Sequence, residues 1–223
     1  MIHLVVSPLF RLETHEVPPR AVQIRKRDLA INLQKVSPHP KPKVALEQYT
    51  VPADLAAEIL FLACYVYGDI EGKWVADLGT GTGRLALGAS MLDAEYVVGI
   101  DLDPLSLAAA SRNCKLLGLQ ADWVLGDIET LRGRVDTVLM NPPFGTKRPH
   151  ADVQFLDVAL KLGTVIYSIH KSSTRRFLHR WLLQRDTEVE RVITTKMEIP
   201  HQFSFHTKRR RYVDVDVFRI ERS

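Results

Sequence analysis

The sequence is poor in cysteine and contains no long apolar run. Its 223 residues include two cysteines, Cys64 and Cys114, which are not spaced as metal ligands and lie in apolar helical patterns. Both are expected to be small buried hydrophobic residues, as free cysteines usually are, and a reducing cytoplasm suits them. No apolar stretch approaches the roughly 20 residues that span a bilayer. The sequence therefore predicts a cytoplasmic location, with neither a metal site nor a membrane segment.

Charge and the first residues narrow the class further. The net charge of +4 and the 46% of hydrophobic residues are typical of a globular, mildly basic protein. Such a charge is compatible with RNA as a partner but does not select it, because many enzymes are equally basic. The apolar start is interrupted by Pro8 and Arg11 and lacks a basic leader, so no signal peptide is predicted. Residues 1–24 are expected to form an extension of unknown role.

Apolar patterns predict an alternation of helices and strands. A helical period runs over residues 24–36, and a proline-rich linker follows over 37–43. The next helix is expected to start at Asp54, its cap, and to stop at Gly68. Short apolar strands, with helices between them, are then expected at residues 73–78, 96–101, 122–126, 134–140 and 164–170. This alternation is typical of a parallel, doubly wound sheet with helices on both faces.

The last part of the chain follows a different pattern. Residues 190–200 and 211–220 alternate as strands do, and residues 201–210 between them are too few for a crossover helix. They predict an antiparallel hairpin that closes one edge of the sheet. The predicted fold is therefore α/β and Rossmann-like, with a mostly parallel sheet and a C-terminal antiparallel hairpin.

A glycine-rich loop, "DLGTGTGRL" (77–85), follows the first predicted strand. Gly79, Gly81 and Gly83 let the backbone turn tightly and approach a ligand closely. The dinucleotide-binding fingerprint needs a glycine at the later position where Arg84 stands, and the Lys-Ser/Thr pair of a phosphate-binding loop is absent. A glycine loop alone is a weak signal, so a purely structural turn stays an equal alternative.

Acidic residues stand at the ends of three successive predicted strands. Asp101 closes "YVVGID" and is placed to accept hydrogen bonds from both hydroxyls of a ribose. Asp127, in "LGDIE", is placed to accept an adenine amine while Ile128 packs on the ring. Each acid alone is equally well a loop residue or a helix cap, but together with Asp77 they outline an adenosine without a phosphate. S-adenosylmethionine suits this outline, because an anionic rim favours its sulfonium and ammonium groups.

The turn "NPPF" ends the fourth predicted strand, beside the expected methyl donor. Two prolines in a row fix φ and lack N–H groups, so they lock an extended turn and leave carbonyl oxygens unpaired. If the Asn141 side-chain oxygen and the Pro142 carbonyl each accept an N–H of an aromatic amine, the nitrogen lone pair turns toward the methyl group. Phe144 is then expected to stack on the flipped base, and a turn with no chemical duty is the alternative. The predicted catalytic residues are Asn141, Pro142, Pro143 and Phe144.

These motifs together resemble class I methyltransferases of the amino group of adenine, guanine or glutamine. More closely, "NPPFGTK" followed by "IHKSSTR" resembles the methyltransferase-like protein five family and its archaeal relatives, over residues 25–220. The resemblance implies a seven-stranded sheet, S-adenosylmethionine as the donor, and formation of N6-methyladenine in small-subunit ribosomal RNA. It also implies a small zinc-binding activator protein that pairs with the sheet edge.

The resemblance further assigns residues by position. Residues 25–53 are expected to contribute a helix and a linker to the cofactor site of a methyltransferase domain that spans residues 54–223. Together with the residues argued from their strand ends, the predicted cofactor-binding residues are Gln48, Thr50, Asp77, Gly79, Gly81, Thr82, Asp101, Asp127 and Ile128.

Basic segments are expected to supply the contacts to RNA. Any one of them alone is better explained as solvated surface, but the run at 208–211 lies in the hairpin turn beside "FSFH". Basic residues interleaved with aromatics suit phosphate contact and base stacking. His170 is either a residue of the cleft or a satisfied edge histidine. The predicted RNA-binding residues are Lys147, His170, Lys171, His206, Lys208, Arg209 and Arg210.

Two other functions stay open. Methyl transfer to a protein glutamine uses a similar Asn-Pro-Pro-aromatic turn, although "HKSSTR" and the basic hairpin count against it. A non-catalytic RNA-binding assembly factor is the second, and the intact donor loop and catalytic turn disfavour it. Methyl transfer to a ring carbon is remote, because it generally needs a cysteine nucleophile beside the donor and Cys114 is expected in the middle of a helix.

Overall fold

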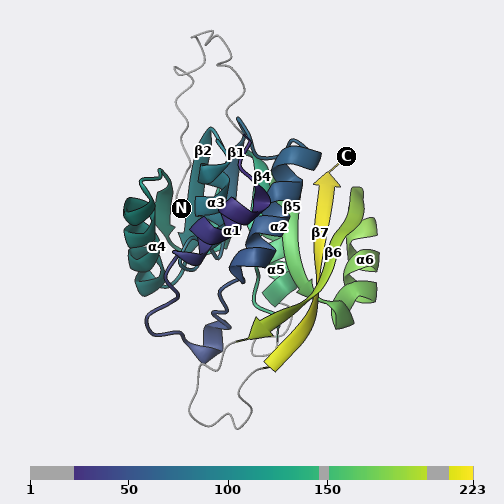
Figure 1. The fold of residues 1–223 in the computed structure, drawn as a ribbon. Helices are drawn as coiled ribbons and strands as arrows, with labels where there is room; N and C mark the ends of the chain where they lie inside the picture. The colour runs from purple at the N-terminus through teal and green to yellow at the C-terminus, as the bar shows by residue number, and fades with distance from the viewer. Residues whose placement is uncertain (1–22, 146–150, 200–210, 223) are drawn as a thin grey trace.

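The computed structural model describes residues 23–145, 151–199 and 211–222. Within them the chain forms a seven-stranded sheet in the order β3-β2-β1-β4-β5-β7-β6 (Figure 1). Strands β1 to β5 pair in parallel, whereas β7 runs antiparallel to both β5 and β6. The predicted α/β fold with its antiparallel hairpin is confirmed. The strands are β1 (Trp74–Leu78), β2 (Tyr96–Asp101), β3 (Asp122–Leu125), β4 (Val135–Met140), β5 (Gly163–Lys171), β6 (Thr187–Ile199) and β7 (Arg211–Arg222).

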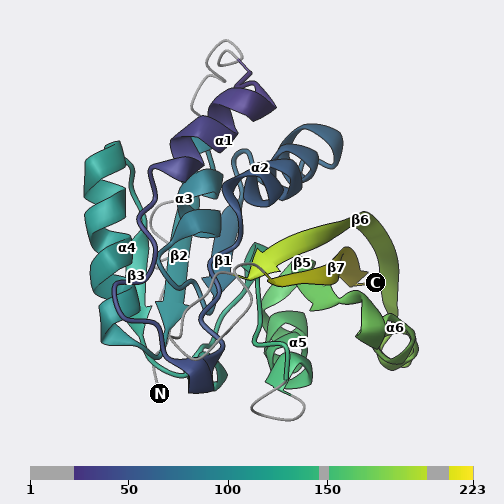
Figure 2. The same cartoon turned by 60° about the horizontal axis from the view of Figure 1, so that its bottom comes forward.

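Helices cover both faces of the sheet. Helices α1 to α4 pack on one face, and α5 and α6 pack on the other (Figure 2). The α-helices are α1 (Lys26–Gln34), α2 (Ala53–Phe61), α3 (Arg84–Met91), α4 (Pro104–Leu117), α5 (Ala151–Leu162) and α6 (Arg175–Leu183). Single turns of other helical types are η2 (Val44–Leu46), η3 (Leu62–Val66), η4 (Ile128–Thr130) and η5 (Ser172–Thr174).

The central strands are apolar on both sides because both sides are covered. In β1, Val75 belongs to the core on the α1–α4 side, and its neighbours Ala76 and Leu78 belong to the core on the α5–α6 side. The same division separates Val97 from Val98 in β2. Burying an aliphatic side chain completely stabilises the fold by about 1.5–3 kcal/mol. This two-sided burial accounts for the nearly continuous apolar runs of the sequence.

The strand register aligns the motifs at one edge. Leu78, at the end of β1, lies beside Ile100 in β2 and Met140 in β4. The residues that follow, namely the glycine loop, Asp101 and Asn141, therefore emerge together at the carboxyl ends of three neighbouring strands. Ligands of open α/β sheets bind at this edge.

Helix α2 begins and ends differently from the prediction. It starts at Ala53, preceded by Pro52 and without a side-chain cap, so the prediction of Asp54 as the cap is wrong. Proline suits a helix start because the first N–H groups have no partner within the helix. The helix then widens into a π-turn, Leu62–Val66, which the apolar period does not reveal. It stops before Gly68, as predicted, where φ is +72°.

His170 lies inside the fold, which corrects its prediction as an RNA-binding residue. Its side chain is 2% exposed, and its Nε2 lies 2.6 Å from Ser168 Oγ. Because alternate residues of a strand share a face, residues 168 and 170 both point into the layer beneath the sheet, where the imidazole also packs near Phe218. Burial lowers the pKa of His170 to about 3, since a charged ring would lose its hydration.

Replacing His170 by glutamine is expected to remove a pH-dependent part of the stability. An unfolded histidine titrates near pH 6.5, and the folded pKa of His170 is lowered to about 3. Between these values the unfolded state binds more protons, so His170 makes the free energy of unfolding fall as the pH is lowered. The slope is at most about 1.4 kcal/mol per pH unit.

Urea denaturation at several pH values measures this contribution as the difference between the wild type and His170→Gln. The difference should shrink as the pH falls from about 6.5 toward about 3. The exposed His179 provides the control, because His179→Gln makes the same replacement at the surface. A difference for His170→Gln that is independent of pH would contradict the buried, neutral state.

Candidate active site

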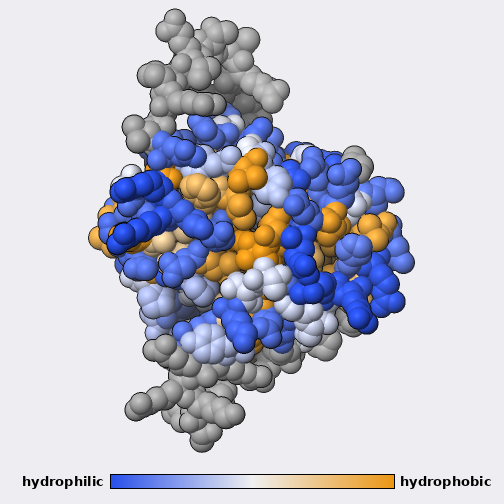
Figure 3. Space-filling model, turned by 45° about the vertical axis from the view of Figure 1, so that its right-hand side comes forward, coloured by the Kyte–Doolittle hydropathy of each residue, from blue (hydrophilic) through white to orange (hydrophobic). Residues whose placement is uncertain are grey.

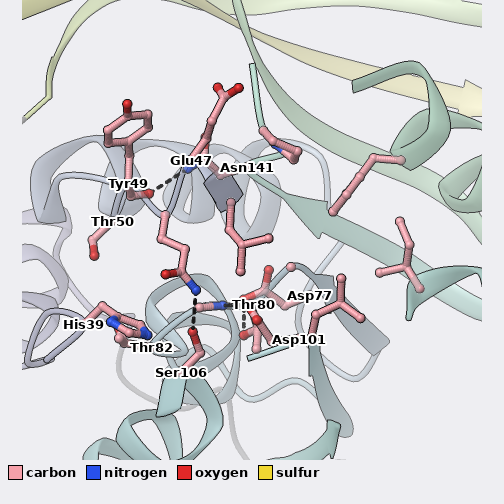
Figure 4. Close-up of a pocket in the computed structure, with 18 of the residues that line it drawn as sticks. His39, Glu47, Tyr49, Thr50, Asp77, Thr80, Thr82, Asp101, Ser106 and Asn141 are labelled. Atoms are coloured by element: carbon pink, nitrogen blue, oxygen red, sulfur yellow. Dashed lines mark hydrogen bonds between the residues drawn. The ribbon is translucent and has the colours of Figure 1, made fainter. Parts of the chain in front are cut away.

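A pocket opens at the carboxyl ends of β1, β2 and β4 (Figure 4). We call residues 36–51 the strap, because they connect α1 to α2 and residues 45–51 form part of the pocket wall. Pro142 and Phe144, both predicted as catalytic, are not in the lining. The predicted site residues that do line the pocket are Gln48, Thr50, Asp77, Gly79, Gly81, Thr82, Asp101, Asp127, Ile128, Asn141 and Pro143.

Asp77 fastens the glycine loop to helix α3. Its Oδ2 accepts hydrogen bonds from Thr80 Oγ1 at 2.7 Å and from the backbone N–H of Ala86 at 3.1 Å. The residue is 2% exposed, and this burial raises the pKa of Asp77 to about 7. These contacts make Asp77 a residue that shapes the loop, and its direct contact with a ligand stays a prediction.

Two glycines of the loop have different duties. At Gly83, where φ is +86°, an added Cβ would stand 2.8 Å from the Trp123 ring. At Gly81, where φ is +57°, an added Cβ would enter open space, and this residue lines the pocket. Gly83 therefore lets the loop pack closely on the sheet side, whereas Gly81 leaves the backbone open to a ligand.

Asp101 reaches the pocket from the tip of β2. Its Oδ2 accepts the N–H of Gly81 at 2.9 Å, and its Oδ1 accepts the N–H of Asp103 at 2.8 Å. Burial raises the pKa of Asp101, and these two backbone hydrogen bonds oppose the rise. They hold the carboxylate in one orientation and still leave lone pairs for further donors, since each carboxylate oxygen accepts about two.

Asp103 is a site residue that the sequence analysis missed. It is 1% exposed, caps α4 by accepting the N–H of Leu105, and accepts Nε2 of Gln48 at 2.9 Å. His39 Nε2 lies 3.1 Å and Lys43 Nζ 3.3 Å from its carboxylate. Burial alone would raise the pKa of Asp103, but the hydrogen bonds from Gln48, Leu105 and Lys43 keep it below its usual value. The Asp-Pro pair in the sequence indicates a helix start, but no local pattern indicates that Asp103 also binds the strap.

Arg84 holds the two ends of the strap. Its Nη1 donates to the carbonyl of Val51 at 2.6 Å, and its Nη2 donates to the carbonyl of Val36 at 2.8 Å. Burial lowers the pKa of Arg84. Arg84, which stands at the position where a dinucleotide-binding loop needs glycine, thus binds the strap.

Asn141 lies at the pocket wall, and the amide of its side chain is held by the strap (Figure 4). Its Nδ2 donates to the carbonyl of Tyr49 at 3.0 Å. Its Oδ1 is buried and has no hydrogen-bond partner within the described part of the chain. Leaving a buried acceptor unsatisfied costs about 1–3 kcal/mol, so such a group is expected where a ligand brings the donor.

The strap also binds the backbone of the turn after β4. Oε2 of Glu47 accepts the N–H of Phe144 at 2.9 Å, and Glu47 is 6% exposed with a φ of +48°. Phe144 is 9% exposed and belongs to the core, with Lys171 Nζ 5.5 Å from the ring centre. In this arrangement the ring packs in the core, and its stacking on a base stays a prediction.

Asp127 and Ile128 supply a polar and an apolar group side by side. Asp127 Oδ1 accepts the N–H of Glu129 at 3.0 Å and so caps η4. Ile128 is 6% exposed, packs in the core on the α5–α6 side and lines the pocket. An acceptor next to an apolar surface is what the adenine prediction requires.

Proteins from two animals match the chain over most of its length. It is 36% identical to the rRNA N(6)-adenosine-methyltransferase Mettl5 of Drosophila melanogaster, over 89% of this chain and 97% of that protein. It is 34% identical to the rRNA N(6)-adenosine-methyltransferase METTL5 of Danio rerio, over 88% of this chain and 99% of that protein. The chain belongs to the METTL5 family.

Other matches include a solved structure over most of the chain and a methyltransferase family model over part of it. The crystal structure of PH1948 from Pyrococcus horikoshii is 42% identical and has a TM-score of 0.83, over 90% of this chain and 99% of that one. The family model of ribosomal protein L11 methyltransferase (PrmA) matches residues 61–141. The ribosomal protein L11 methyltransferase of Geobacter sulfurreducens is 42% identical over 30% of this chain and 22% of that protein. The match to the PrmA model thus spans the glycine loop and β1 to β4, and stops at Asn141.

S-adenosylmethionine fits the lining of this METTL5-family pocket. The open space at Gly81 leaves room for S-adenosylmethionine to approach the protein backbone. Asp101 places an acidic group in the lining, where a sulfonium and an ammonium would be attracted. Asp101 would hold the ribose, and Ile128 would pack on the adenine.

The structure describes two of the residues predicted to bind RNA. Lys171, at the end of β5, is partly exposed and lies over Phe144, whereas His170 is buried. The other five lie outside the described residues; they are Lys147, His206, Lys208, Arg209 and Arg210.

Predictions from the sequence also concern the cysteines, metal sites and membrane helices. Cys64 and Cys114 are free and buried, as predicted. Those ranges contain no group of three His, Cys, Asp or Glu side chains arranged for a metal ion. They also contain no helix long and apolar enough to cross a membrane.

Asp101→Asn is expected to weaken the binding of S-adenosylmethionine about tenfold to a hundredfold. A hydrogen bond to a charged group contributes about 1.5–3 kcal/mol, and the ribose would no longer form one. Isothermal titration calorimetry with S-adenosylmethionine measures the change. Asp136→Asn is the matched control, because Asp136 accepts the N–H of Trp74 at 2.8 Å at the other end of the sheet. Unchanged affinity in Asp101→Asn would remove the ribose assignment.

Glu47→Ala is expected to lower the melting temperature and the rate of methyl transfer more than Glu47→Gln does. Alanine leaves the buried N–H of Phe144 without its acceptor, which costs about 1–3 kcal/mol, whereas glutamine retains a side-chain oxygen. Thermal unfolding and single-turnover kinetics measure the two effects. If both variants behave alike, the side-chain acceptor of Glu47 does not hold the turn.

Proposed function

We propose that this protein transfers a methyl group from S-adenosylmethionine to the N6 amine of an adenine in ribosomal RNA, and that this RNA is the small-subunit one. Membership of the METTL5 family supports the reaction and the substrate class, because both matched animal proteins are named for them. The choice of the small subunit is the narrower part of the proposal. It rests on the resemblance of the sequence motifs.

The observation that carries the proposal is the Oδ1 of Asn141, which has no partner among the described residues. The carbonyl of Tyr49 holds the other end of the amide, so a buried acceptor is presented at the pocket wall in a fixed orientation. An exocyclic amine brings N–H donors that match this acceptor. A thiolate has no such donor and a hydroxyl has only one, whereas an exocyclic amine has two.

The residues of the turn act on the amine by hydrogen bonding. When bound, S-adenosylmethionine supplies an electrophilic methyl group on a sulfonium. Asn141 Oδ1 accepts one N–H of the amine and draws the nitrogen lone pair out of conjugation with the ring, and the carbonyl of Pro142 is proposed as the second acceptor. Pro143 keeps the turn rigid. These hydrogen bonds strengthen as positive charge develops on the nitrogen, and the proton then leaves to water, so no general base is required.

Methyl transfer to a protein is the second candidate, because the PrmA family model matches residues 61–141. That match stops at the end of β4, whereas the METTL5 relatives match 88–89% of the chain. Because those matches leave out only 11–12% of the chain, they extend past β4 into β5 and α6. RNA is therefore the favoured substrate, and the oriented amide of Asn141 disfavours a purely non-catalytic assembly factor.

The proposal extends to partners, location and the division of the chain. A small zinc-binding activator protein is proposed to pair with an edge of the sheet, where β3 and β6 are the outer strands of the described sheet. A cytoplasmic location is proposed, with which the free cysteines are compatible. Residues 25–53 are proposed to act with the domain at 54–223, because the strap lines the pocket. Of residues 1–24, predicted as an extension of unknown role, residues 1–22 lie outside the described residues.

Asn141→Ala is expected to lower turnover by at least about a hundredfold, as the loss of a positioned transition-state hydrogen bond does. The affinity for S-adenosylmethionine should fall far less than turnover, because Arg84 and Asp103 still hold the strap when the hydrogen bond from Asn141 to Tyr49 is lost. Transfer of labelled methyl groups to separated cellular RNAs and proteins, followed by nucleoside analysis, measures the activity. Asn32→Ala is the control, since Asn32 on α1 bonds the carbonyl of Asp28 and lies outside the pocket lining.

The same assay separates the candidate substrates. Label in N6-methyladenine of small-subunit RNA would support the whole proposal. Label in protein glutamine would replace RNA by protein as the substrate. Full activity of Asn141→Ala would show that the turn does not perform the chemistry.

A further inference from the structure

A second groove lies between α6 and β6, and its walls are basic. Arg176, His179 and Arg180 line it from α6, and Arg191 lines it from β6. Strongly hydrophilic residues gather over these elements at the right of Figure 3. The pocket at the carboxyl ends of β1, β2 and β4 shares none of these residues.

Three arginines of the groove have no carboxylate partner among the described residues. Arg176, Arg180 and Arg191 are exposed, and none of them forms an ion pair within the described ranges. Arg175 differs, because its Nε and Nη2 bind Asp216 at 2.6 and 2.8 Å. The groove therefore presents three guanidinium groups whose charge no carboxylate of the described chain neutralises.

The arrangement on α6 works against the stability of the free protein. Arg176 and Arg180 stand four residues apart and so lie on the same side of the helix, where like charges repel by a few tenths of a kcal/mol. Arg191 adds a third positive charge across the groove. The carboxylate in the lining, Glu190, acts on another group, because burial and then Glu190 raise the pKa of Tyr67. Such a cluster is relieved by an anion that bridges the two walls.

The groove is connected to the catalytic turn through β5. Met140 pairs with Ser168 in the register of β4 and β5, so the last residues of β5 lie beside the turn after β4. Lys171 ends β5 with its ammonium over the ring of Phe144. The single turn η5 and then the first turn of α6, with Arg176, follow directly. A short stretch of chain, which carries Lys171 and Arg176, therefore connects the end of β5 beside the catalytic turn to the groove.

We propose that this groove binds the phosphate backbone of the RNA strand that flanks the target adenine. The inference rests on the proposed function, because it assumes an RNA substrate. Arginine suits the duty, since its planar guanidinium donates two parallel hydrogen bonds to a phosphate. Contacts to phosphates position a nucleic acid without reading its bases. The groove thus orients the RNA, while the pocket selects the amine.

The test is a triple variant, Arg176→Gln, Arg180→Gln and Arg191→Gln. Fluorescence anisotropy with a fragment of small-subunit ribosomal RNA, at several salt concentrations, measures binding. The slope of log affinity against log salt should become shallower by about one for each phosphate that the variant no longer binds, hence by up to about three. Affinity at low salt should fall at least about tenfold. The KM for RNA should rise, while kcat at saturating RNA and the affinity for S-adenosylmethionine stay unchanged.

A second triple variant controls for net charge. Arg27→Gln, Lys35→Gln and Lys115→Gln remove the same charge from α1, its C-terminal end and α4, which lie on the other face of the sheet. This variant should keep nearly all of the RNA affinity and the salt slope. Equal losses in both variants would overturn the proposal, because the effect would then follow from total charge alone.

Failure of the groove and failure of the proposed function give different results. If the wild type methylates RNA but the groove variant binds it with unchanged affinity and salt slope, the groove inference is wrong and the function stands. If the wild type labels protein and no RNA, both are wrong. Thermal unfolding of the groove variant completes the set, since removing like charges should leave its melting temperature unchanged or higher.

Discussion

The hydrogen bond from Asn141 to the carbonyl of Tyr49 is the contact on which the site depends. It joins the strap, which precedes the sheet in the chain, to the turn that follows the fourth strand, and it sets the direction of the Asn141 acceptor. The strap is itself held by Arg84 and by Asp103. The same set of contacts therefore fixes both the wall of the donor pocket and the orientation of the catalytic amide.

Much of the fold follows from local patterns. Apolar strands alternating with helices indicate a doubly wound sheet, and the shorter connection between the last two strands indicates an antiparallel pair. The carboxyl ends of parallel strands meet at one edge. For this reason the glycine loop, Asp101 and Asn141 are brought together as predicted, although they come from well-separated parts of the chain.

The remaining features depend on contacts between distant segments. Asp103 is readable as a helix cap, but its bonds to His39, Lys43 and Gln48 require the strap to fold back over β2. The sequence places Phe144 in the turn after the fourth strand, near the expected cleft. Whether its ring faces a ligand or the core is decided by packing alone. His170 is similar, because a histidine at the end of an apolar strand is buried only if a neighbouring layer covers it.

The way in which the strap is held has a consequence for how the family diverges. Arg84 and Asn141 bind it through the carbonyl oxygens of Val36, Tyr49 and Val51, atoms that every amino acid possesses. Substitutions at those three positions leave the anchoring atoms in place, whereas no other residue reproduces the forked guanidinium of Arg84. Variation among homologues at residues 36, 49 and 51 should therefore leave the strap anchored, whereas changes at Glu47 or Gln48 remove contacts that their side chains make.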